Sequence, residues 1–298
     1  MTETPETAAD APVDVIVGGS GMVGRMLARA WRARGGGPAF QYRRGNGAHL
    51  PRPDLHWDPM LGPEPFVEWA RLKGGCRTMV VLAGVTLKSG ANFEANVPVA
   101  EACLEAAYRA GVSRVLYAST SAVYGPGSGR PFTEADPPNP ANAYGVAKVA
   151  AEAVCARYRE KGMMITALRI GNVAGADQLL INAGKATDAA PLKLDRFADG
   201  TGPRRCYIGA GMLARVLERL MEAEDLPDVL NVGTPVPVTM EGLLTSAGTI
   251  WRWVPAPASA VQDLVLDCSA LAEIVPFRTE DSLPEVHVAE WRRFGDPQ

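Results

Sequence analysis

The sequence is poor in the residues that bind metal ions or form disulfide bonds. Its 298 residues include only five cysteines and three histidines. The cysteines lie far apart and form no Cys-x-x-Cys pair, so the spacing typical of zinc and redox sites is absent. An odd, scattered set of cysteines is typical of buried or free thiols in a reducing compartment. We therefore expect no metal site and a cytoplasmic location.

Long apolar runs and basic clusters are missing as well. No stretch approaches the 18 uninterrupted apolar residues of a membrane-spanning helix. The net charge is −3, and acidic and basic residues are interspersed, without the basic stripe that a nucleic-acid backbone requires. Residues 1–12 lack the basic start and apolar run of a signal peptide, and their small polar composition predicts a disordered leader. Neither a membrane nor a nucleic acid is expected as a partner.

The segment after this leader predicts a dinucleotide site. The apolar run "VDVIV" (13–17) is typical of a buried central strand, and apolar residues recur at helical spacing from position 22 onward. A glycine-rich turn between strand and helix lets a pyrophosphate approach backbone N–H groups at the helix start. The alternative is a glycine-rich turn without a ligand, which this placement disfavours. The residues expected to hold the coenzyme here are Gly18, Ser20, Gly21, Met22, Val23 and Gly24.

Acidic residues are absent between Asp14 and Asp54, and this absence bears on the coenzyme. An acid about 20 residues after the glycines usually binds the ribose 2′-hydroxyl of NAD. Arg43 and Arg44 stand at the end of the expected second strand instead, where guanidinium groups suit a 2′-phosphate. NADP is therefore favoured over NAD, with two solvated surface arginines as the alternative.

Strands and helices continue to alternate along the chain. "TMVVLAG" (78–84) and "SRVLYAS" (113–119) are expected as buried strands, with an amphipathic helix over 93–111 between them. The pattern predicts an α/β fold, a Rossmann-type doubly wound parallel sheet, with Ala83 and Gly84 close to the coenzyme. We expect the Rossmann domain at 13–170. Residues 171–298 would form mainly a small substrate-binding portion, with one or more strands returning to the sheet.

Hydroxyl, tyrosine and lysine side chains are expected near the end of that sheet. Ser119, Thr120 and Ser121 follow a predicted central strand, where ligands of such sheets bind. A helix from about residue 142 carries Tyr144 and Lys148 at i and i+4, on one face. Hydride transfer at a carbinol carbon requires a proton to move with the oxygen, and a tyrosine with a pKa near 10 is a poor base at pH 7. A neighbouring lysine cation would lower that pKa, and a hydroxyl group would polarise the substrate oxygen.

Together these motifs resemble the extended short-chain dehydrogenases/reductases of the NAD-dependent epimerase/dehydratase group. The resemblance runs from about Val13 to the C-terminus and is carried by "GGSGMVG", "LAG", "STSAVYG", "YGVAK", "LRIGNVAG" and "NVG". It implies Tyr144 as general acid/base, Lys148 as its partner and a ligand of the nicotinamide ribose, and Thr120 as the active hydroxyl. Ser119 is the neighbour to test if Thr120 proves dispensable. The resemblance also implies a homodimer that pairs the alanine-rich helices at 93–111 and 142–161.

The same resemblance suggests two residues for substrate binding. Asn172 would touch substrate, although an asparagine that caps a turn is an equal alternative. Arg205 corresponds to an arginine that holds a diphosphate in relatives using nucleotide-linked sugars, and its fork-shaped cation suits phosphate oxygens. Arg204 and Arg205 are otherwise interpreted as a solvated pair. The sequence departs from the family pattern directly afterwards, because "GAGM" stands where relatives usually carry an acidic pair.

These observations favour an NAD(P)-dependent oxidoreductase or epimerase that acts at a carbonyl or carbinol carbon, most plausibly of a nucleotide sugar. Dehydration ranks last, because Ser121 and Ala122 follow Thr120 where a dehydratase usually has an acid. The alternative from another class is a non-catalytic dinucleotide-binding redox sensor of the same fold. A sensor would be expected to lose the tyrosine or the lysine, and both are present.

Overall fold

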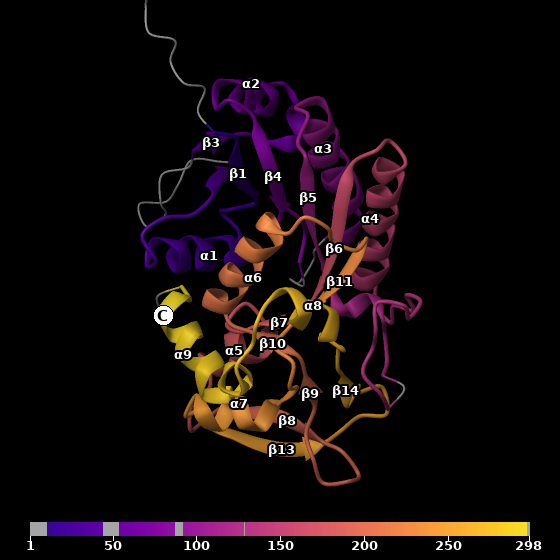
Figure 1. Cartoon of the computed structure of the whole chain (residues 1–298). Coiled ribbons are helices and arrows are strands. Elements are labelled where there is room, and N and C mark those ends of the chain that lie inside the picture. Colours follow the sequence, from indigo (N-terminus) through magenta and orange to yellow (C-terminus); the bar gives the residue numbers. More distant parts are fainter. Residues whose placement is uncertain (1–10, 44–53, 87–91, 128, 297–298) are drawn as a thin grey trace, which may run out of the picture.

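The central element of the computed structural model is a sheet of seven strands, all parallel, in the order β11-β6-β5-β4-β1-β2-β3 (Figure 1). The structure describes residues 11–43, 54–86, 92–127 and 129–296. The predicted strands at 13–17, 78–84 and 113–119 are confirmed with small changes at their ends. The strands of this sheet are β1 Val13–Val17, β2 Ala39–Tyr42, β3 Leu55–His56, β4 Cys76–Val81, β5 Arg114–Thr120, β6 Met164–Ile170 and β11 Val229–Val232.

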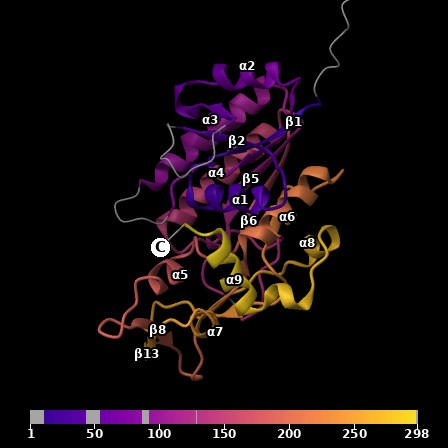
Figure 2. The ribbon, with the colours of Figure 1, turned by 90° about the vertical axis from the view of Figure 1, so that its left-hand side faces the viewer.

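Helices cover both faces of the sheet (Figures 1 and 2). Side chains alternate between the faces along each strand, so Ile16 packs with α1 and α6 while Val15 and Val17 pack with α2, α3 and α4. Both clusters are fully buried, which confirms the doubly wound α/β fold. These helices are α1 Met22–Arg32, α2 Glu64–Leu72, α3 Asn96–Arg109, α4 Ala143–Arg159 and α6 Ala210–Glu222.

A smaller portion lies beyond the carboxyl ends of β5 and β6 and has its own core around Tyr207, Leu243 and Val288 (Figure 1). Short strands pair here as β7 with β10, β12-β9-β14, and β8 with β13. The strands are β7 Asn172–Val173, β8 Leu192–Arg196, β9 Arg204–Arg205, β10 Tyr207–Ile208, β12 Val238–Thr239, β13 Trp251–Pro255 and β14 Asp263–Leu264. The helices are α5 Gln178–Ala183, α7 Met240–Ser246, α8 Ser269–Ile274 and α9 Pro284–Phe294.

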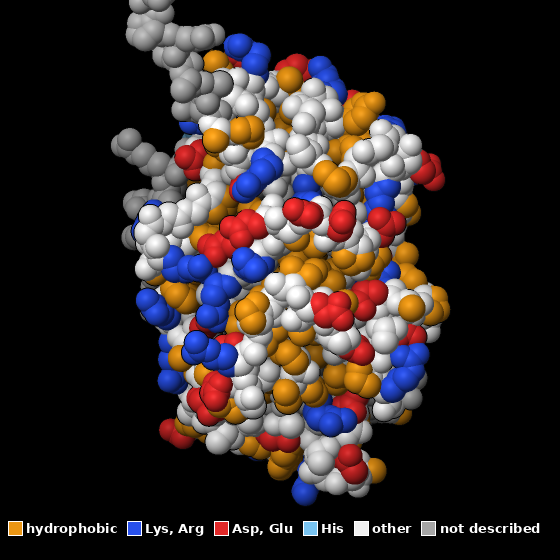
Figure 3. All heavy atoms as spheres, viewed as in Figure 1, with side chains coloured by type: hydrophobic (Ala, Val, Ile, Leu, Met, Phe, Trp, Pro, Cys, Tyr) orange, Lys and Arg blue, Asp and Glu red, His pale blue; other side chains and the backbone are white. Residues whose placement is uncertain are grey.

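The last helix, α9, joins the two portions. Arg29 on α1 donates to Asp296 at 2.8 Å, and Arg25 binds the same carboxylate. Basic side chains gather over α1 and α9 at the left of the molecule in Figure 3. The end of the described chain is thus held against the first helix of the Rossmann portion. Within the described ranges, no helix is both long and apolar enough to cross a bilayer.

Candidate active site

The glycine turn after β1 packs tightly against the end of β4. Gly18 has φ of 95°, a conformation that favours glycine. A Cβ atom on Gly18 would also lie 2.6 Å from the backbone nitrogen of Ala83. The Gly18 N–H donates to Oε1 of Gln41 on β2 at 2.8 Å. The turn is therefore fixed between β4 and β2, and it contacts Ala83, one of the predicted coenzyme residues.

The start of α1 has the properties of an anion site. Gly21 is its N-cap residue and makes no side-chain capping bond, and the first turn carries no acidic residue. The first N–H groups of a helix have no partner within the helix, and the helix dipole favours negative charge there. A pyrophosphate fits this turn for two reasons. The turn contains Gly18, Gly19 and Gly21, which leave the backbone N–H groups at the start of α1 accessible, and the first turn of α1 has no carboxylate that would compete for them.

The end of β2 carries no carboxylate. Tyr42 is its last residue, is fully buried, and would lie 2.5 Å from a Cβ atom on Gly19. Arg43 follows it and is exposed. Arg44, the second predicted phosphate ligand, lies outside the described residues. The strand that packs against the glycine turn therefore ends in a buried aromatic ring, and an exposed arginine follows it.

The structure brings Thr120, Tyr144 and Lys148 to one place. Thr120 is the last residue of β5. The side chain of Asn142 accepts from the Gly145 N–H at 2.9 Å and so caps the start of α4, which sets Tyr144 in its first turn and Lys148 one turn later. The Thr120 hydroxyl interacts with the phenol of Tyr144, whose ring packs edge-on against Phe93 with ring centres 5.7 Å apart.

Lys148 is 5% exposed and is held by β5. Its Nζ donates to the Ala118 carbonyl at 2.5 Å and to the Tyr117 hydroxyl at 3.2 Å. Burial lowers its pKa to about 8 from 10.5, because the interior disfavours the ammonium, while Cys155 and Glu152 act in the opposite direction. Lys148 therefore titrates much nearer to neutral pH than an exposed lysine does.

The sequence predicts that the Lys148 cation and the positive nicotinamide of the coenzyme together lower the pKa of Tyr144; in the chain alone its direction is upward. Burial raises the pKa of this phenol above 10, and the Thr120 hydroxyl offsets only part of that rise. The hydrogen-bond partners of the Lys148 ammonium are the Ala118 carbonyl and the Tyr117 hydroxyl.

Gly84 lies close to Lys148 in the segment that follows β4. A Cβ atom placed on it would lie 4.0 Å from Nζ of Lys148 and 2.6 Å from Oδ1 of Asn96. The Asn96 side chain holds both the N–H and the carbonyl of Val85, each at 3.0 Å. The segment that follows β4 therefore lies between the glycine turn and Lys148, as expected for a coenzyme that spans both.

The predicted substrate residues lie in the smaller portion. Asn172 pairs in register with Tyr207, and its backbone N–H donates to the Cys206 carbonyl at 2.8 Å. The guanidinium of Arg205 donates to the carbonyls of Val261 and Gln262 at 2.8 and 2.7 Å. Arg205 thus contacts the loop that precedes β14, and burial lowers the pKa of its guanidinium.

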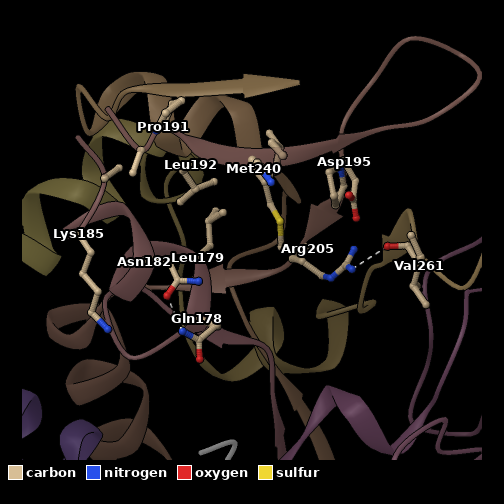
Figure 4. Close-up of a pocket in the computed structure, with 16 residues that line it drawn as sticks. Gln178, Leu179, Asn182, Lys185, Pro191, Leu192, Asp195, Arg205, Met240 and Val261 are labelled. Carbon is tan, nitrogen blue, oxygen red and sulfur yellow. Dashed lines mark hydrogen bonds between the residues drawn. The ribbon is translucent and has the colours of Figure 1, made fainter. Parts of the chain in front are cut away.

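Arg205 also lines a cavity of about 660 Å³ (Figure 4). Lys185 and Lys193 are two further cations of its wall, and Asp195 is an acid there. The excess of positive charge suits an anionic ligand. Thr120, Tyr144 and Lys148 are not part of the wall. The wall consists of Gln178, Leu179, Asn182, Lys185, Ala186, Ala190, Pro191, Leu192, Lys193, Leu194, Asp195, Pro203, Arg205, Met240, Ala260 and Val261. Ile170 pairs with Thr120 at the end of β6, and Asn172 follows two residues later.

Several residues of this region were not predicted. Tyr117 and the Ala118 carbonyl hold Lys148, and Glu152 lies one turn beyond it on α4. The i+4 spacing from Lys148 to Glu152 was a signal for the last of these. Among the described residues, no group of three or more His, Cys, Asp or Glu side chains is arranged to hold a metal ion.

Comparison with known proteins identifies the family. The model of the NAD dependent epimerase/dehydratase family matches residues 15–233, which is most of the chain. The chain belongs to the NAD dependent epimerase/dehydratase family. This confirms the resemblance that the motifs predicted.

Individual relatives agree with this membership. UDP-glucose 4-epimerase of Corynebacterium glutamicum is 34% identical over 117 residues, which cover 37% of this chain and 36% of that protein. The match thus spans about a third of that curated relative. Two UDP-glucose 4-epimerase structures with NAD share the fold. The Brucella ovis protein has a TM-score of 0.78 at 23% identity, covering 94% of this chain and 97% of that one. The Thermus thermophilus protein has a TM-score of 0.74 at 24% identity, covering 94% and 98%.

Proposed function

We propose that the protein is an NAD(P)-dependent oxidoreductase or epimerase that acts at a carbonyl or carbinol carbon of a nucleotide sugar. The observation that carries this proposal is the meeting of Thr120, Tyr144 and Lys148 at the end of β5, beside Gly84 and the glycine turn. The cationic cavity lined by Arg205, Lys185 and Lys193 supports an anionic substrate, and the named relatives are UDP-glucose 4-epimerases.

Each catalytic side chain has one task in this proposal. The coenzyme supplies a nicotinamide ring that accepts or donates a hydride. Tyr144 takes the hydroxyl proton from the substrate or returns it at the phenolic oxygen. Thr120 holds the substrate oxygen through a hydrogen bond. Lys148 carries a positive charge next to the same pocket and binds the coenzyme ribose, as its proximity to Gly84 supports.

NADP is the coenzyme that we propose. The glycine turn from Gly18 to Gly24 would hold the pyrophosphate, and Arg43, with Arg44, would bind a 2′-phosphate. Support comes from β2, which ends in the buried Tyr42 rather than in an acid that would accept a ribose hydroxyl. Both named structures hold NAD, so the proposal sets this chain apart from them.

A ligand panel in a thermal-unfolding assay tests the coenzyme and the substrate. A ligand stabilises the folded protein more the further its concentration exceeds its Kd, by about 2.7 kcal/mol at 100 times the Kd. At equal concentrations NADP, the tighter ligand in this proposal, should therefore raise the melting temperature more than NAD does. Arg43→Ala should remove the preference for NADP. Arg71→Ala, which changes an exposed arginine paired with Glu68 on α2, is the matched control and should leave the preference intact. An equal or larger shift with NAD would overturn the choice of coenzyme.

The same assay tests the cavity with UDP-glucose, added at saturating coenzyme. Arg205→Gln should abolish the shift produced by the sugar nucleotide, measured against the ligand-free melting temperature of that variant. Arg204→Gln is the control, because Arg204 is exposed, binds Asp263 and does not line the cavity. If both variants respond to UDP-glucose like the wild type, the cavity does not bind the diphosphate through Arg205.

We also propose that the protein forms a homodimer through α3 and α4. The outer face of α4 exposes Val146 at 55%, followed by Ala150 and Ala153 at helical spacing. Sedimentation should show a dimer at micromolar concentration, and Val146→Arg should convert it to a monomer. Leu72→Arg changes another exposed apolar residue, on α2, and should leave the dimer intact. A wild-type protein that sediments only as a monomer contradicts the proposal.

A further inference from the structure

A buried group of polar side chains lies behind the catalytic residues. Arg169 on β6 is 4% exposed and binds Glu152 on α4, with Nη2 to Oε2 at 2.9 Å and Nε to Oε1 at 3.2 Å. The hydroxyl of Ser119 on β5, which is 5% exposed, donates to the same carboxylate. We call Ser119, Glu152 and Arg169 the buried network. It joins three elements of the Rossmann portion.

Stability alone does not explain this network. Removing two charges from water costs several kcal/mol each, and an apolar replacement is often as stable or more so. One guanidinium nitrogen of Arg169, Nη1, is buried without a hydrogen-bond partner, which adds to the cost. An arrangement of this kind is better explained by the geometry that it imposes.

The buried network holds β5 at Ser119, between the two residues of this strand that contact Lys148 and Tyr144. The carbonyl of Ala118 accepts from Lys148, and Thr120 carries the hydroxyl that faces Tyr144. Ser119 lies between Ala118 and Thr120, so a shift of Ser119 would move both the Ala118 carbonyl and the Thr120 hydroxyl. Because side chains alternate along a strand, Ser119 points into the protein while Thr120 points toward the phenol.

Glu152 places the other end of the network on the catalytic helix. It lies one turn after Lys148 and two turns after Tyr144 on α4, so the three share one face. Its bond to Ser119 therefore clamps that face to the end of β5.

Arg169 is fixed in turn. It pairs in register with Ser119, and its guanidinium lies 4.7 Å from the ring centre of Tyr124. The Tyr124 hydroxyl donates to Asn231 on β11 at 2.8 Å. The network is thus anchored to β6 and, through Tyr124, to the neighbouring edge strand β11.

We propose that Ser119, Glu152 and Arg169 are positioning residues, which hold the Thr120 hydroxyl and the Ala118 carbonyl in place for Tyr144 and Lys148. They touch neither substrate nor coenzyme in this proposal. The inference deepens the proposed function, because it assigns the geometry of that same site. It also differs from the interpretation of Ser119 as a substitute for Thr120, since its hydroxyl is engaged by Glu152.

Ser119→Ala is the variant that tests the proposal. It removes one hydrogen bond and leaves the Glu152–Arg169 pair intact, whereas Glu152→Gln would leave the Arg169 charge unpaired in the interior and threaten folding. Ser119→Thr restores a hydroxyl group and should rescue the function. Tyr158→Phe is the control on the same helix, because it removes a hydroxyl that binds Glu105 rather than β5 or β6.

The readout is the titration of the Tyr144 phenol by ultraviolet difference absorbance, with the matching Tyr144→Phe variant subtracted. It is measured with and without coenzyme and requires no substrate. The titratable groups around this site are Lys148, Glu152 and Cys155 from α4, Cys103 from α3 and Tyr117 from β5. Ser119→Ala replaces none of them, although it removes one hydrogen bond from Glu152. The pKa of Tyr144 should rise by roughly half a unit or more, because a loosened Thr120 no longer stabilises the phenolate. Turnover should fall about tenfold to a hundredfold at unchanged coenzyme affinity.

The outcomes separate this inference from the proposed function. An Ala variant with a lower melting temperature but a wild-type phenol titration would show a purely structural role and overturn the inference. A shifted phenol titration that is rescued by Ser119→Thr and absent in Tyr158→Phe would support it. If the wild type converts no nucleotide sugar, the proposed function fails, while the phenol titration still decides the positioning role.

Discussion

Tyr144→Phe should lower turnover of the nucleotide sugar at least ~100-fold, the usual contribution of a general acid/base, while coenzyme affinity stays within about twofold. The change removes one oxygen atom and keeps the ring that packs against Phe93, so the first turn of α4 should remain in place. Steady-state conversion of UDP-glucose measures the first effect. Coenzyme titration followed by protein fluorescence measures the second.

Tyr108→Phe is the matched control for this variant. Tyr108 lies on α3 and is 48% exposed, so loss of its hydroxyl should not affect turnover. Unchanged turnover in Tyr144→Phe would exclude the phenol as the proton-transferring group. Coenzyme binding by a wild-type protein that shows no measurable turnover would instead support the redox-sensor alternative.

The fold was predictable because its signals are local. A buried strand, a glycine turn and an apolar helical face follow each other within residues 13–32, and the structure places β1 and α1 there. Tyr144 and Lys148 share a helix, so their spacing alone predicts a common face. The relation of Thr120 to that helix followed from a general property of parallel sheets, in which ligand-binding side chains gather beyond the carboxyl ends of the strands.

The contacts that surround these residues were not predictable in this way. Arg169 meets Glu152 across 17 positions, and Ser119 meets it across 33, so no local pattern contains these pairs. The covering helix α6 and the ribbon of β8 and β13 also escaped prediction. The strands of that ribbon are separated by more than 50 residues and pair only in the folded protein.

The pKa of Tyr144 shows why residue identity does not determine electrostatics. A tyrosine four positions before a lysine suggests a lowered phenol pKa, but burial of the phenol in the chain alone acts in the upward direction. The outcome depends on how deeply the phenol is buried and on which partners take the lysine protons. Both are properties of tertiary packing, here of the Ala118 carbonyl and the Tyr117 hydroxyl.

Lys148→Met should make the protein more stable at pH 7 while it lowers turnover at least ~100-fold. Burial lowers the pKa of Lys148 to about 8 in the folded protein, against 10.5 for a free lysine. The folded state therefore binds this proton less tightly than the unfolded chain does. The wild type is destabilised by the buried ammonium below about pH 8, and it regains that stability as the pH rises toward 10.5.

Methionine has a similar length and no charge, so the variant avoids this cost. Its free energy of unfolding at pH 7 should exceed that of the wild type by about 1–2 kcal/mol, after the loss of two hydrogen bonds is subtracted. Urea unfolding at pH 7, 8, 9 and 10 should show the difference shrinking as the pH rises. Lys161→Met, at an exposed lysine beyond the end of α4, should show no such trend. A Lys148→Met variant that is less stable than the wild type at pH 7 would mean that the ammonium stabilises the fold. The expected destabilisation by the buried charge would then be wrong.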